Sequence, residues 1–438
     1  MRVGVGVVGV RRAPAWWAAG VVALLVIVSA VLSGLPGDDG RAVRAAPGPP
    51  GAVVPASQGA WVGAWSAAPT GSEPGTRDGL GGQSLRNAVQ VSAGGTAVRV
   101  ELSNRYGSQP VTFTRASVGL AVGPGSAEAV AHSVVPLAFG GGAAVTIPVG
   151  GVVLSDAVSL AVEPATRLLV SVYAPGPSGP VTYHRHARET NFAARGEHTA
   201  EVSGATYTAT TEHWRYLTGV QVFSPASPGA VVVLGDSLTD GISSTPGAGH
   251  RWTDFLAARL EGTPVLNLGI SGNRLLRDGS PGRSYNGASG LSRLHSDVLR
   301  QEGATVLVVQ LGINDILRAP REPDAGEIVA GLERLAAEAR ENGLRVVGAT
   351  LMPYEGHYAW SDRGEAVRQE VNERLRAGGV FDGLIDLDAA LRDPADPSRL
   401  LPAYDSGDAL HPTDAGFRAM AEAVDPALLM GVEPAAVL

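Results

Sequence analysis

Four short blocks of the sequence hold residues suited to chemistry on an ester. They are GDSL at 235–238, SG at 271–272, GIND at 312–315 and DALH at 408–411. Acyl transfer needs a hydroxyl nucleophile, a base that takes its proton, a group that orients the base, and donors for the oxyanion. The four blocks contain residue types for each of these tasks, so they predict one site of nucleophilic catalysis.

Each task has a candidate residue. Ser237 is the predicted nucleophile and His411 the predicted base. Asp408 lies three residues before the histidine, so one local turn can present both, and its carboxylate can hold the far ring nitrogen. The predicted oxyanion donors are the backbone N–H groups of Ser237 and Gly272 and the side-chain amide of Asn314, with the glycine allowing a close backbone approach. This chemistry needs no metal and no cofactor, and we expect neither.

The same residue types have simpler explanations. Gly, Asp, Ser and Asn are ordinary turn residues, and any one of the blocks alone would be a weak signal. Asp236 is adjacent to Ser237 and points away from it in an extended chain, so we expect Asp236 to brace the loop rather than to orient the base. Asp240 is a second candidate brace. Arg274, just after the second block, is either a substrate contact or a solvated loop residue.

The elements around the blocks indicate a parallel sheet. After residue 229, apolar strands alternate with helical stretches, and a helix is predicted over 324–342. Such alternation is typical of a parallel sheet covered on both faces, with ligands beyond the carboxyl ends of its strands. Pro412 suits the first turn of a helix, which would place His411 at or just before its start. The predicted strands are 230–234, 264–268, 305–311, 344–350 and 383–387.

Taken in this order, the blocks resemble those of the GDSL, or SGNH, hydrolases. The resemblance covers residues 230–430 and implies an ester hydrolase without a cofactor. It also implies an α/β, flavodoxin-like three-layer fold with a five-stranded parallel sheet in the order 2-1-3-4-5. The family blocks name a catalytic serine, an oxyanion glycine, an oxyanion asparagine, and a catalytic histidine with an aspartate three residues earlier. They match Ser237, Gly272, Asn314, His411 and Asp408, respectively.

Upstream, residues 59–228 are rich in strand signals. The stretch TAVRVELSN alternates apolar and charged residues, and similar short runs end at Gly, Pro or Asp, which favours a β-sandwich-like domain. WVGAWSAAP at 61–69 and LSNRYGSQPV at 102–111 resemble exported actinobacterial acylhydrolases that carry a β domain before the hydrolase domain. We therefore predict a β-rich domain at 59–228 and a catalytic domain at 229–432.

The N-terminus is typical of an export signal. Three arginines precede an apolar run at 15–35, and a small-residue cleavage site is available at Val43 to Ala45. The run is also long enough to span a bilayer, so residues 1–46 are either a signal peptide or an uncleaved anchor, followed by a Pro/Gly-rich linker. The predicted location is secreted, or anchored to the cell membrane through this segment alone.

Composition excludes several classes of function. The chain has no cysteine, and all 34 of its basic residues are arginine, which excludes disulfides, a Cys nucleophile and a Schiff-base lysine. A net charge of −8 argues against a nucleic-acid partner. His184 and His186 in YHRH would share one strand face. That spacing can bind a metal, but with no third ligand evident we expect a surface or interface role.

Three functions remain open. The first is an exported ester hydrolase that acts through an acyl-enzyme on small-molecule or polysaccharide esters. The second is an acyltransferase in which a sugar hydroxyl replaces water at the same site. The third is a non-catalytic carbohydrate-binding protein whose β domain binds the sugar. In that case a sugar-binding face would be lined by Trp61, Trp65, Trp214 and Tyr216. Core or interface positions are nevertheless expected for these aromatic residues.

The acyl preference depends on loops. The segment MPYEGHYAWSDRG at 352–364 follows the fourth predicted strand, and its Tyr354, Tyr358 and Trp360 are candidates for shaping the substrate pocket. We recognise no apolar lid of the kind used by lipases for long chains. The sequence therefore favours short acyl chains or acetylated carbohydrate.

Overall fold

The computed structural model describes residues 59–225, 229–321 and 324–430, which belong to one compact unit. The predicted signal or anchor at 1–46 lies outside the described residues, as do 226–228 in the joint between the two predicted domains. Within the described part of the chain, no helix has the length and apolar character needed to cross a membrane.

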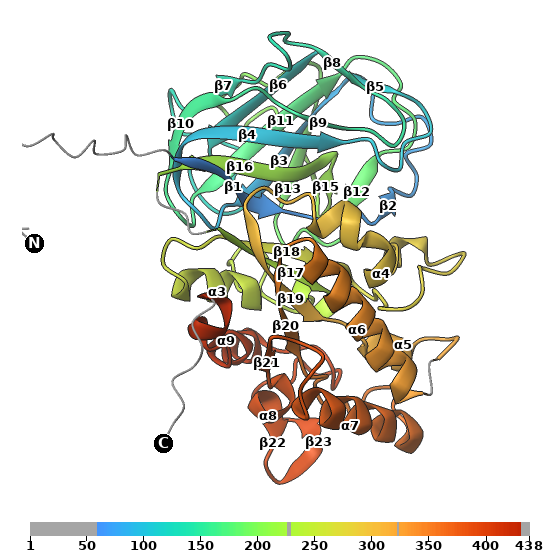
Figure 1. Ribbon diagram of the computed structural model, residues 1–438. Coiled ribbons are helices and arrows are strands. Elements are labelled where there is room, and N and C mark those ends of the chain that lie inside the picture. Colours follow the sequence, from blue (N-terminus) through green and yellow to red (C-terminus); the bar gives the residue numbers. More distant parts are fainter. Residues whose placement is uncertain (1–58, 226–228, 322–323, 431–438) are drawn as a thin grey trace, which may run out of the picture. The chain divides into compact units, whose positions relative to one another are not determined.

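Residues 59–225, called here the β-strand region, consist of antiparallel strands (Figure 1). In chain order these are β1 (Ala60–Ser66), β2 (Gly71–Ser72), β3 (Gln83–Gln90), β4 (Gly95–Ser103), β5 (Val111–Phe113), β6 (Arg115–Leu120), β7 (Val135–Pro136), β8 (Val145–Ile147), β9 (Val152–Leu154), β10 (Val158–Val162), β11 (Arg167–Ala174), β12 (Thr182–His184), β13 (Asn191–Arg195), β14 (Ala209–Thr211), β15 (Trp214–Arg215) and β16 (Leu217–Ser224). One large sheet has the order β1-β16-β4-β10, with β9 also on β4, and the other has the order β14-β13-β3-β11-β6-β7. Two smaller sheets are β15-β12-β2 and β5-β8. The expectation of a sandwich-like antiparallel region is confirmed.

The alternation seen in the sequence explains how these sheets pack. In β4, Val98, Val100 and Leu102 are all fully buried, whereas Arg99 and Glu101 between them are partly exposed. Successive side chains of a strand point to opposite faces, so the three apolar residues lie on the face that packs into the core. They share one apolar cluster with residues of β11 in the other large sheet.

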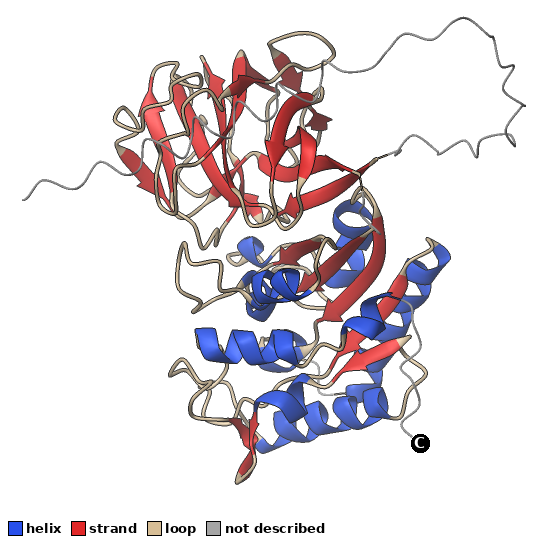
Figure 2. Ribbon diagram, turned by 90° about the vertical axis from the view of Figure 1, so that its left-hand side faces the viewer, coloured by secondary structure: helices blue, strands red, loops and turns tan. Residues whose placement is uncertain are grey.

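Residues 229–430, called here the α/β region, alternate strands and helices (Figure 2). In chain order the elements are β17 (Ala230–Gly235), α2 (Ser237–Asp240), α3 (Trp252–Arg259), β18 (Val265–Gly269), η1 (Ser284–Asn286), α4 (Gly290–Arg293), η2 (Leu294–Val298), β19 (Ala304–Gln310), α5 (Ile313–Leu317), α6 (Ala325–Glu341), β20 (Arg345–Ala349), α7 (Asp362–Arg376), β21 (Gly383–Ile385), α8 (Leu387–Leu391), β22 (Arg392–Asp393), β23 (Asp396–Leu400), α9 (Asp414–Glu422) and α10 (Pro426–Met430). The parallel sheet has the order β18-β17-β19-β20-β21, which is 2-1-3-4-5 by position in the chain. The predicted fold class is therefore confirmed.

The central strand β17 is buried on both faces. Val231 and Val233 belong to an apolar cluster that includes residues of α3 and α9. Val232 and Leu234 belong to a second cluster that includes residues of α6, α7 and the β-strand region. Helices thus cover the sheet on both sides, which explains why its strands appear in the sequence as unbroken apolar runs.

The strand register brings the sequence blocks to one edge of the sheet. Gly235 at the end of β17 lies opposite Gly269 of β18 and Gln310 of β19. The GDSL, SG and GIND blocks begin at or shortly after these three positions. Parallel pairing therefore sets three of the four blocks side by side beyond the carboxyl ends of the strands.

The helix predictions hold with one correction. The predicted helix over 324–342 is α6, and the Asp324 side chain caps it by accepting a hydrogen bond from the Gly326 N–H. Pro412, by contrast, does not lie in the first turn of a helix. The α9 helix begins at Asp414, because the Thr413 side chain caps its end by accepting from the Gly416 N–H. His411 therefore belongs to the loop before α9.

Candidate active site

The turn between β17 and α2 presents Ser237 at the first position of α2. Asp236 caps the helix, since its Oδ1 accepts a hydrogen bond from the Leu238 N–H at 3.0 Å. The turn is tight: a Cβ on Gly235 would lie 2.1 Å from the Thr239 Oγ1. Glycine at 235 is therefore what lets the strand turn directly into a helix that carries a serine at its start.

Ser237, His411 and Asp408 form a continuous chain of hydrogen bonds. The Ser237 Oγ lies 2.9 Å from the His411 Nε2, and the His411 Nδ1 lies 2.6 Å from the Asp408 Oδ2. The three residues predicted from sequence to form a nucleophile, a base and an orienting acid are therefore brought together. With the Nδ1 proton directed at the carboxylate, Nε2 is left free to accept the serine proton.

The loop before α9 is organised around Asp408. Its Oδ1 accepts hydrogen bonds from the backbone N–H groups of Leu410 at 3.0 Å and His411 at 2.8 Å, while Oδ2 faces the imidazole. Ala409 between them has a φ of +60°, a left-handed conformation that folds the histidine back over the aspartate. Partial burial would raise the pKa of Asp408, but the hydrogen bonds from the His411 side chain and backbone outweigh it and hold this pKa far below its usual value.

Gly272 and Asn314, two of the predicted oxyanion residues, both lie against Arg318. Gly272 follows the end of β18 with a φ of +76°, and a Cβ there would lie 2.8 Å from both the Arg318 Nη2 and the Asn286 Oδ1. The position therefore requires glycine for conformation and for space. Asn314 lies in α5, and its side chain is buried.

The side chain of Asn314 is held at both ends. Its Oδ1 accepts from the Arg318 Nε at 2.8 Å, and its Nδ2 donates to the Asp236 Oδ2 at 3.0 Å. An amide NH₂ carries two hydrogens, so one remains for an oxyanion. Asp236 is thus a brace, as the sequence suggests, and its burial raises its pKa to about 6 despite the hydrogen bonds from Leu238 and Asn314.

Several other sequence candidates have different surroundings. Arg274 is buried and donates to the backbone carbonyls of Asp278 and Pro320, so it is not a solvated loop residue. In the loop after β20, Tyr354 is fully buried, whereas Tyr358 is 86% exposed and its ring centroid lies 4.3 Å from that of His357. A Cβ on Gly356 would lie 3.0 Å from the Ala409 Cβ, so this part of the loop packs against the turn that carries His411.

Most of the aromatic and histidine candidates of the β-strand region are buried, whereas Trp61 and His186 are partly exposed. Trp65, Trp214 and Tyr216 are buried, and an arginine stacks on Trp61. His184 bonds to Asp240, and no group of three or more His, Asp or Glu side chains in the described ranges is arranged to hold a metal. Trp65, Trp214 and Tyr216 therefore belong to the apolar core.

Sequence reasoning missed Arg318. It is the extended residue that directly follows α5, and its Nε holds the Asn314 amide, but an arginine in a loop-rich segment carries no signal of that role. A Cβ placed on Gly272 would nearly touch its guanidinium, so Arg318 lies against both predicted oxyanion residues.

Comparisons with known proteins give one family match. Residues 233–419 match the model of the GDSL-like lipase/acylhydrolase family. A search of curated proteins gives no match.

Three solved structures show likeness at low identity. They are a GDSL-like lipase from Bacteroides thetaiotaomicron (19% identity, 46% of this chain and 89% of that chain, TM-score 0.36), a carbohydrate acetylesterase family member from Sinorhizobium meliloti (19%, 47% and 100%, 0.36) and a member of the lipolytic protein G-D-S-L family from Veillonella parvula (21%, 48% and 100%, 0.33). Likeness at this level supports no argument about function. The family match, which spans all four sequence blocks, does: residues 233–419 are similar to the GDSL-like lipase/acylhydrolase family, and this match supports a carboxylic ester hydrolase.

Proposed function

We propose that this protein is an exported serine ester hydrolase that cleaves short-chain acyl esters, or acetyl groups on carbohydrate, through an acyl-enzyme on Ser237. The observation that carries the proposal is the unbroken hydrogen-bond chain from Asp408 through His411 to the Ser237 Oγ. Export is inferred from residues 1–46, and the preference for short chains from the absence of a recognisable lid sequence.

The first half of the reaction forms the acyl-enzyme. The Ser237 Oγ attacks the ester carbonyl while its proton passes to the His411 Nε2, and Asp408 stabilises the imidazolium. The negative charge that develops on the carbonyl oxygen is met by the N–H groups of Ser237 and Gly272 and the free amide hydrogen of Asn314. Collapse of the tetrahedral intermediate breaks the bond to the alcohol oxygen, which takes its proton from His411.

The second half regenerates the serine. His411, neutral again, removes a proton from water, and the hydroxide attacks the acyl carbonyl in the same oxyanion site. The Ser237–acyl bond breaks, the carboxylic acid leaves, and His411 returns the proton to the serine oxygen. Every group in both halves comes from the described residues of this chain.

The test compares residues 47–438 with their Ser237→Ala variant on nitrophenyl esters from acetyl to palmitoyl. We expect turnover that depends on Ser237, with the highest kcat/KM at short chains. An optimum at long chains would contradict the acyl preference but not the hydrolase. Absence of turnover on every ester by folded protein would overturn the proposal.

A further inference from the structure

The β-strand region reaches the back of the proposed oxyanion site through one side chain. His184, the last residue of β12, is only 4% exposed, and its Nε2 lies 3.0 Å from the Oδ1 of Asp240 in α2. The two residues are far apart in the sequence and belong to different regions of the fold. The contact joins the first histidine of the YHRH motif to Asp240, which the sequence analysis named as a second candidate brace.

Asp240 passes the contact on to the block that contains Gly272. Its other oxygen, Oδ2, accepts hydrogen bonds from the Ser271 backbone N–H at 2.9 Å and from the Ser271 Oγ at 2.7 Å. Ser271 immediately precedes Gly272. The carboxylate therefore fixes the backbone that leads directly to the proposed oxyanion N–H.

The hydrogen-bond pattern defines the charge state of the pair. The His184 Nδ1 lies 2.7 Å from the Ala68 carbonyl oxygen, and Nε2 faces the Asp240 carboxylate, so both ring nitrogens face acceptors. Only the doubly protonated imidazole donates to both. Burial alone would raise the pKa of Asp240, but the charge of His184 and the hydrogen bonds outweigh it and lower that pKa. The result is a buried pair of opposite charges.

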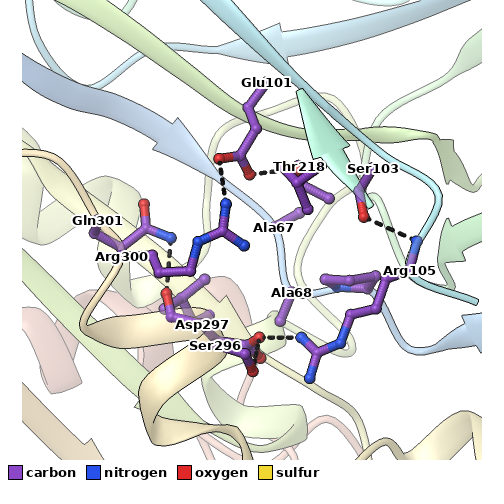
Figure 3. A pocket seen from close by; sticks show the side chains of 13 residues that line it. Ala67, Ala68, Glu101, Ser103, Arg105, Thr218, Ser296, Asp297, Arg300 and Gln301 are labelled. Carbon is purple, nitrogen blue, oxygen red and sulfur yellow. Dashed lines mark hydrogen bonds and ion pairs between the residues drawn. The ribbon is translucent and has the colours of Figure 1, made fainter. Parts of the chain in front are cut away.

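Other contacts hold the two regions together around this pair. Figure 3 shows a small cavity between them where Arg105 meets Asp297 at 2.5 Å and Arg300 meets Glu101 at 3.4 Å. Next to His184 in the chain, Arg185 lies over the ring of Tyr285 in η1, with its Cζ 4.3 Å from the ring centroid. β12 is thus docked firmly enough to position its last side chain.

We propose that His184 is a positioning residue for the oxyanion site. Its imidazolium holds Asp240, Asp240 holds Ser271, and Ser271 sets the direction of the Gly272 N–H. The proposal rests on the proposed function of Gly272. It gives the β-strand region a part in the reaction, as a component of the catalytic site rather than an appended binding module.

A merely structural ion pair would behave differently. Losing such a pair lowers the free energy of unfolding, but the molecules that remain folded turn over normally. Losing a positioning residue weakens an interaction that matters most in the transition state, so kcat falls while KM changes little. Removal of one oxyanion donor costs about 100- to 1,000-fold, and misdirecting a donor should cost less than removing it.

The experiment measures kcat and KM for three variants of the full chain. The concentration of folded active sites is determined by labelling Ser237 to completion with a fluorophosphonate. His184→Leu removes the donor to Asp240 and should lower kcat about 10- to 100-fold with KM within about two-fold. His184→Gln keeps an N–H near the position of Nε2 and should recover most of kcat. Arg300→Gln, which breaks another ion pair between the two regions, is the control and should leave kcat unchanged.

A double variant tests whether the residues act as one unit. If His184 acts only through Asp240, then His184→Leu with Asp240→Asn should lower kcat no further than the more damaging single variant does. Unchanged kcat in His184→Leu, an equal loss in Arg300→Gln, or additive losses in the double variant would overturn the proposal.

Failure of the positioning proposal for His184 can be distinguished from failure of the proposed hydrolase function. If the unaltered protein turns over no ester, the proposed function fails. The positioning proposal is then judged by the rate at which Ser237 reacts with the fluorophosphonate, because the developing charge on that reagent's oxygen needs the same donors. A rate in His184→Leu equal to that of the unaltered protein would contradict it.

Discussion

At the scale of single residues, the proposed chemistry depends on how firmly the neighbours of Ser237 are held. His411 has one partner on each ring nitrogen, and Asn314 is held by Arg318 on one side and Asp236 on the other. Such pre-organisation matters because a donor that must reorient during the reaction contributes less to lowering the barrier.

Asp408→Asn tests the orientation of the base. The variant loses the charge that stabilises the imidazolium and the acceptor that holds the Nδ1 proton, so we expect kcat/KM to fall about 100- to 10,000-fold with little change in the folded fraction. Steady-state kinetics on a short-chain nitrophenyl ester measures the loss. Retention of full activity would show that Asp408 does not orient His411.

The pH dependence of kcat/KM in the unaltered protein also tests the role of Asp408. Because the pKa of Asp408 is held far below its usual value, Asp408 stays ionised wherever the fold survives. The acid limb of kcat/KM should therefore contain the protonation of the base, which must be neutral to act, and no contribution from Asp408. A limb whose steepness falls in the Asp408→Asn variant would show that Asp408 itself is protonated in this pH range.

At the scale of elements, the site depends on what the chain does immediately after each strand. β17 turns into α2 through Asp236, and β18 turns through Gly272, whose φ lies in the left-handed region. These turns hold the nucleophile and the donors at one edge of the sheet.

Gly272→Ala, compared with a control glycine, should show whether a side chain at 272 lowers kcat in addition to straining the backbone. A methyl group there would crowd Arg318 and Asn286 at 2.8 Å, besides costing about 1 kcal/mol for the left-handed conformation. We expect kcat to fall at least about 100-fold. The control is Gly262→Ala, because Gly262 has a similar φ of +79° with nothing within 4 Å of the added carbon. Gly262→Ala should lower the free energy of unfolding and leave kcat unchanged. Equal kcat in the two variants would show that the active site does not require glycine at 272.

The raised pKa of Asp236 should make the difference in unfolding free energy between the unaltered protein and Asp236→Asn depend on pH. A folded-state pKa of about 6 means that the folded protein binds this proton more tightly than the unfolded chain does. As the pH rises from about 4 to about 6, the unaltered protein should therefore lose up to about 3 kcal/mol more unfolding free energy than the variant does. Chemical denaturation across this range gives the difference between the two proteins, and a pH-independent difference would contradict the raised pKa.

The sequence predicts much of this arrangement for physical reasons. The strands of the α/β region are buried on both faces and so appear as continuous apolar runs, and α6 has a one-sided apolar face and an Asp cap. The blocks around Ser237 and His411 were recognisable because their residue types are rare in that combination. Their catalytic roles remain predictions.

Other features could not be predicted because they depend on contacts between distant parts of the chain. His184 and Asp240 meet only when β12 docks against α2, and neither has a local pattern that names the other. Arg318 is found only through its contact with Asn314. The start of α9 was misplaced by two residues, because capping by Thr413 prevails over the preference of Pro412 for a first turn.

At the scale of the whole molecule, the β-strand region and the α/β region share one apolar cluster. That cluster runs from Val98 and Val170 in the antiparallel sheets to Val232 and Leu335 in the parallel sheet and α6. The buried pair of His184 and Asp240 and the contact of Arg105 with Asp297 join the same two regions.

These shared contacts predict that the two regions unfold together. Calorimetry of residues 47–438 should show a single transition in which the calorimetric and van't Hoff enthalpies agree. Two resolved transitions would show that the contact between the regions contributes less to stability than the buried contacts suggest.

The most direct test of the account is to trap the acyl-enzyme. Residues 47–438 would be mixed with 4-nitrophenyl acetate, quenched in acid during the first turnover and analysed by intact mass and peptide mapping. We predict one added acetyl group on the peptide that contains Ser237, and none in the Ser237→Ala variant. Turnover with no acetyl group on Ser237, or with the group on a different residue, would contradict the central claim that Ser237 is the nucleophile.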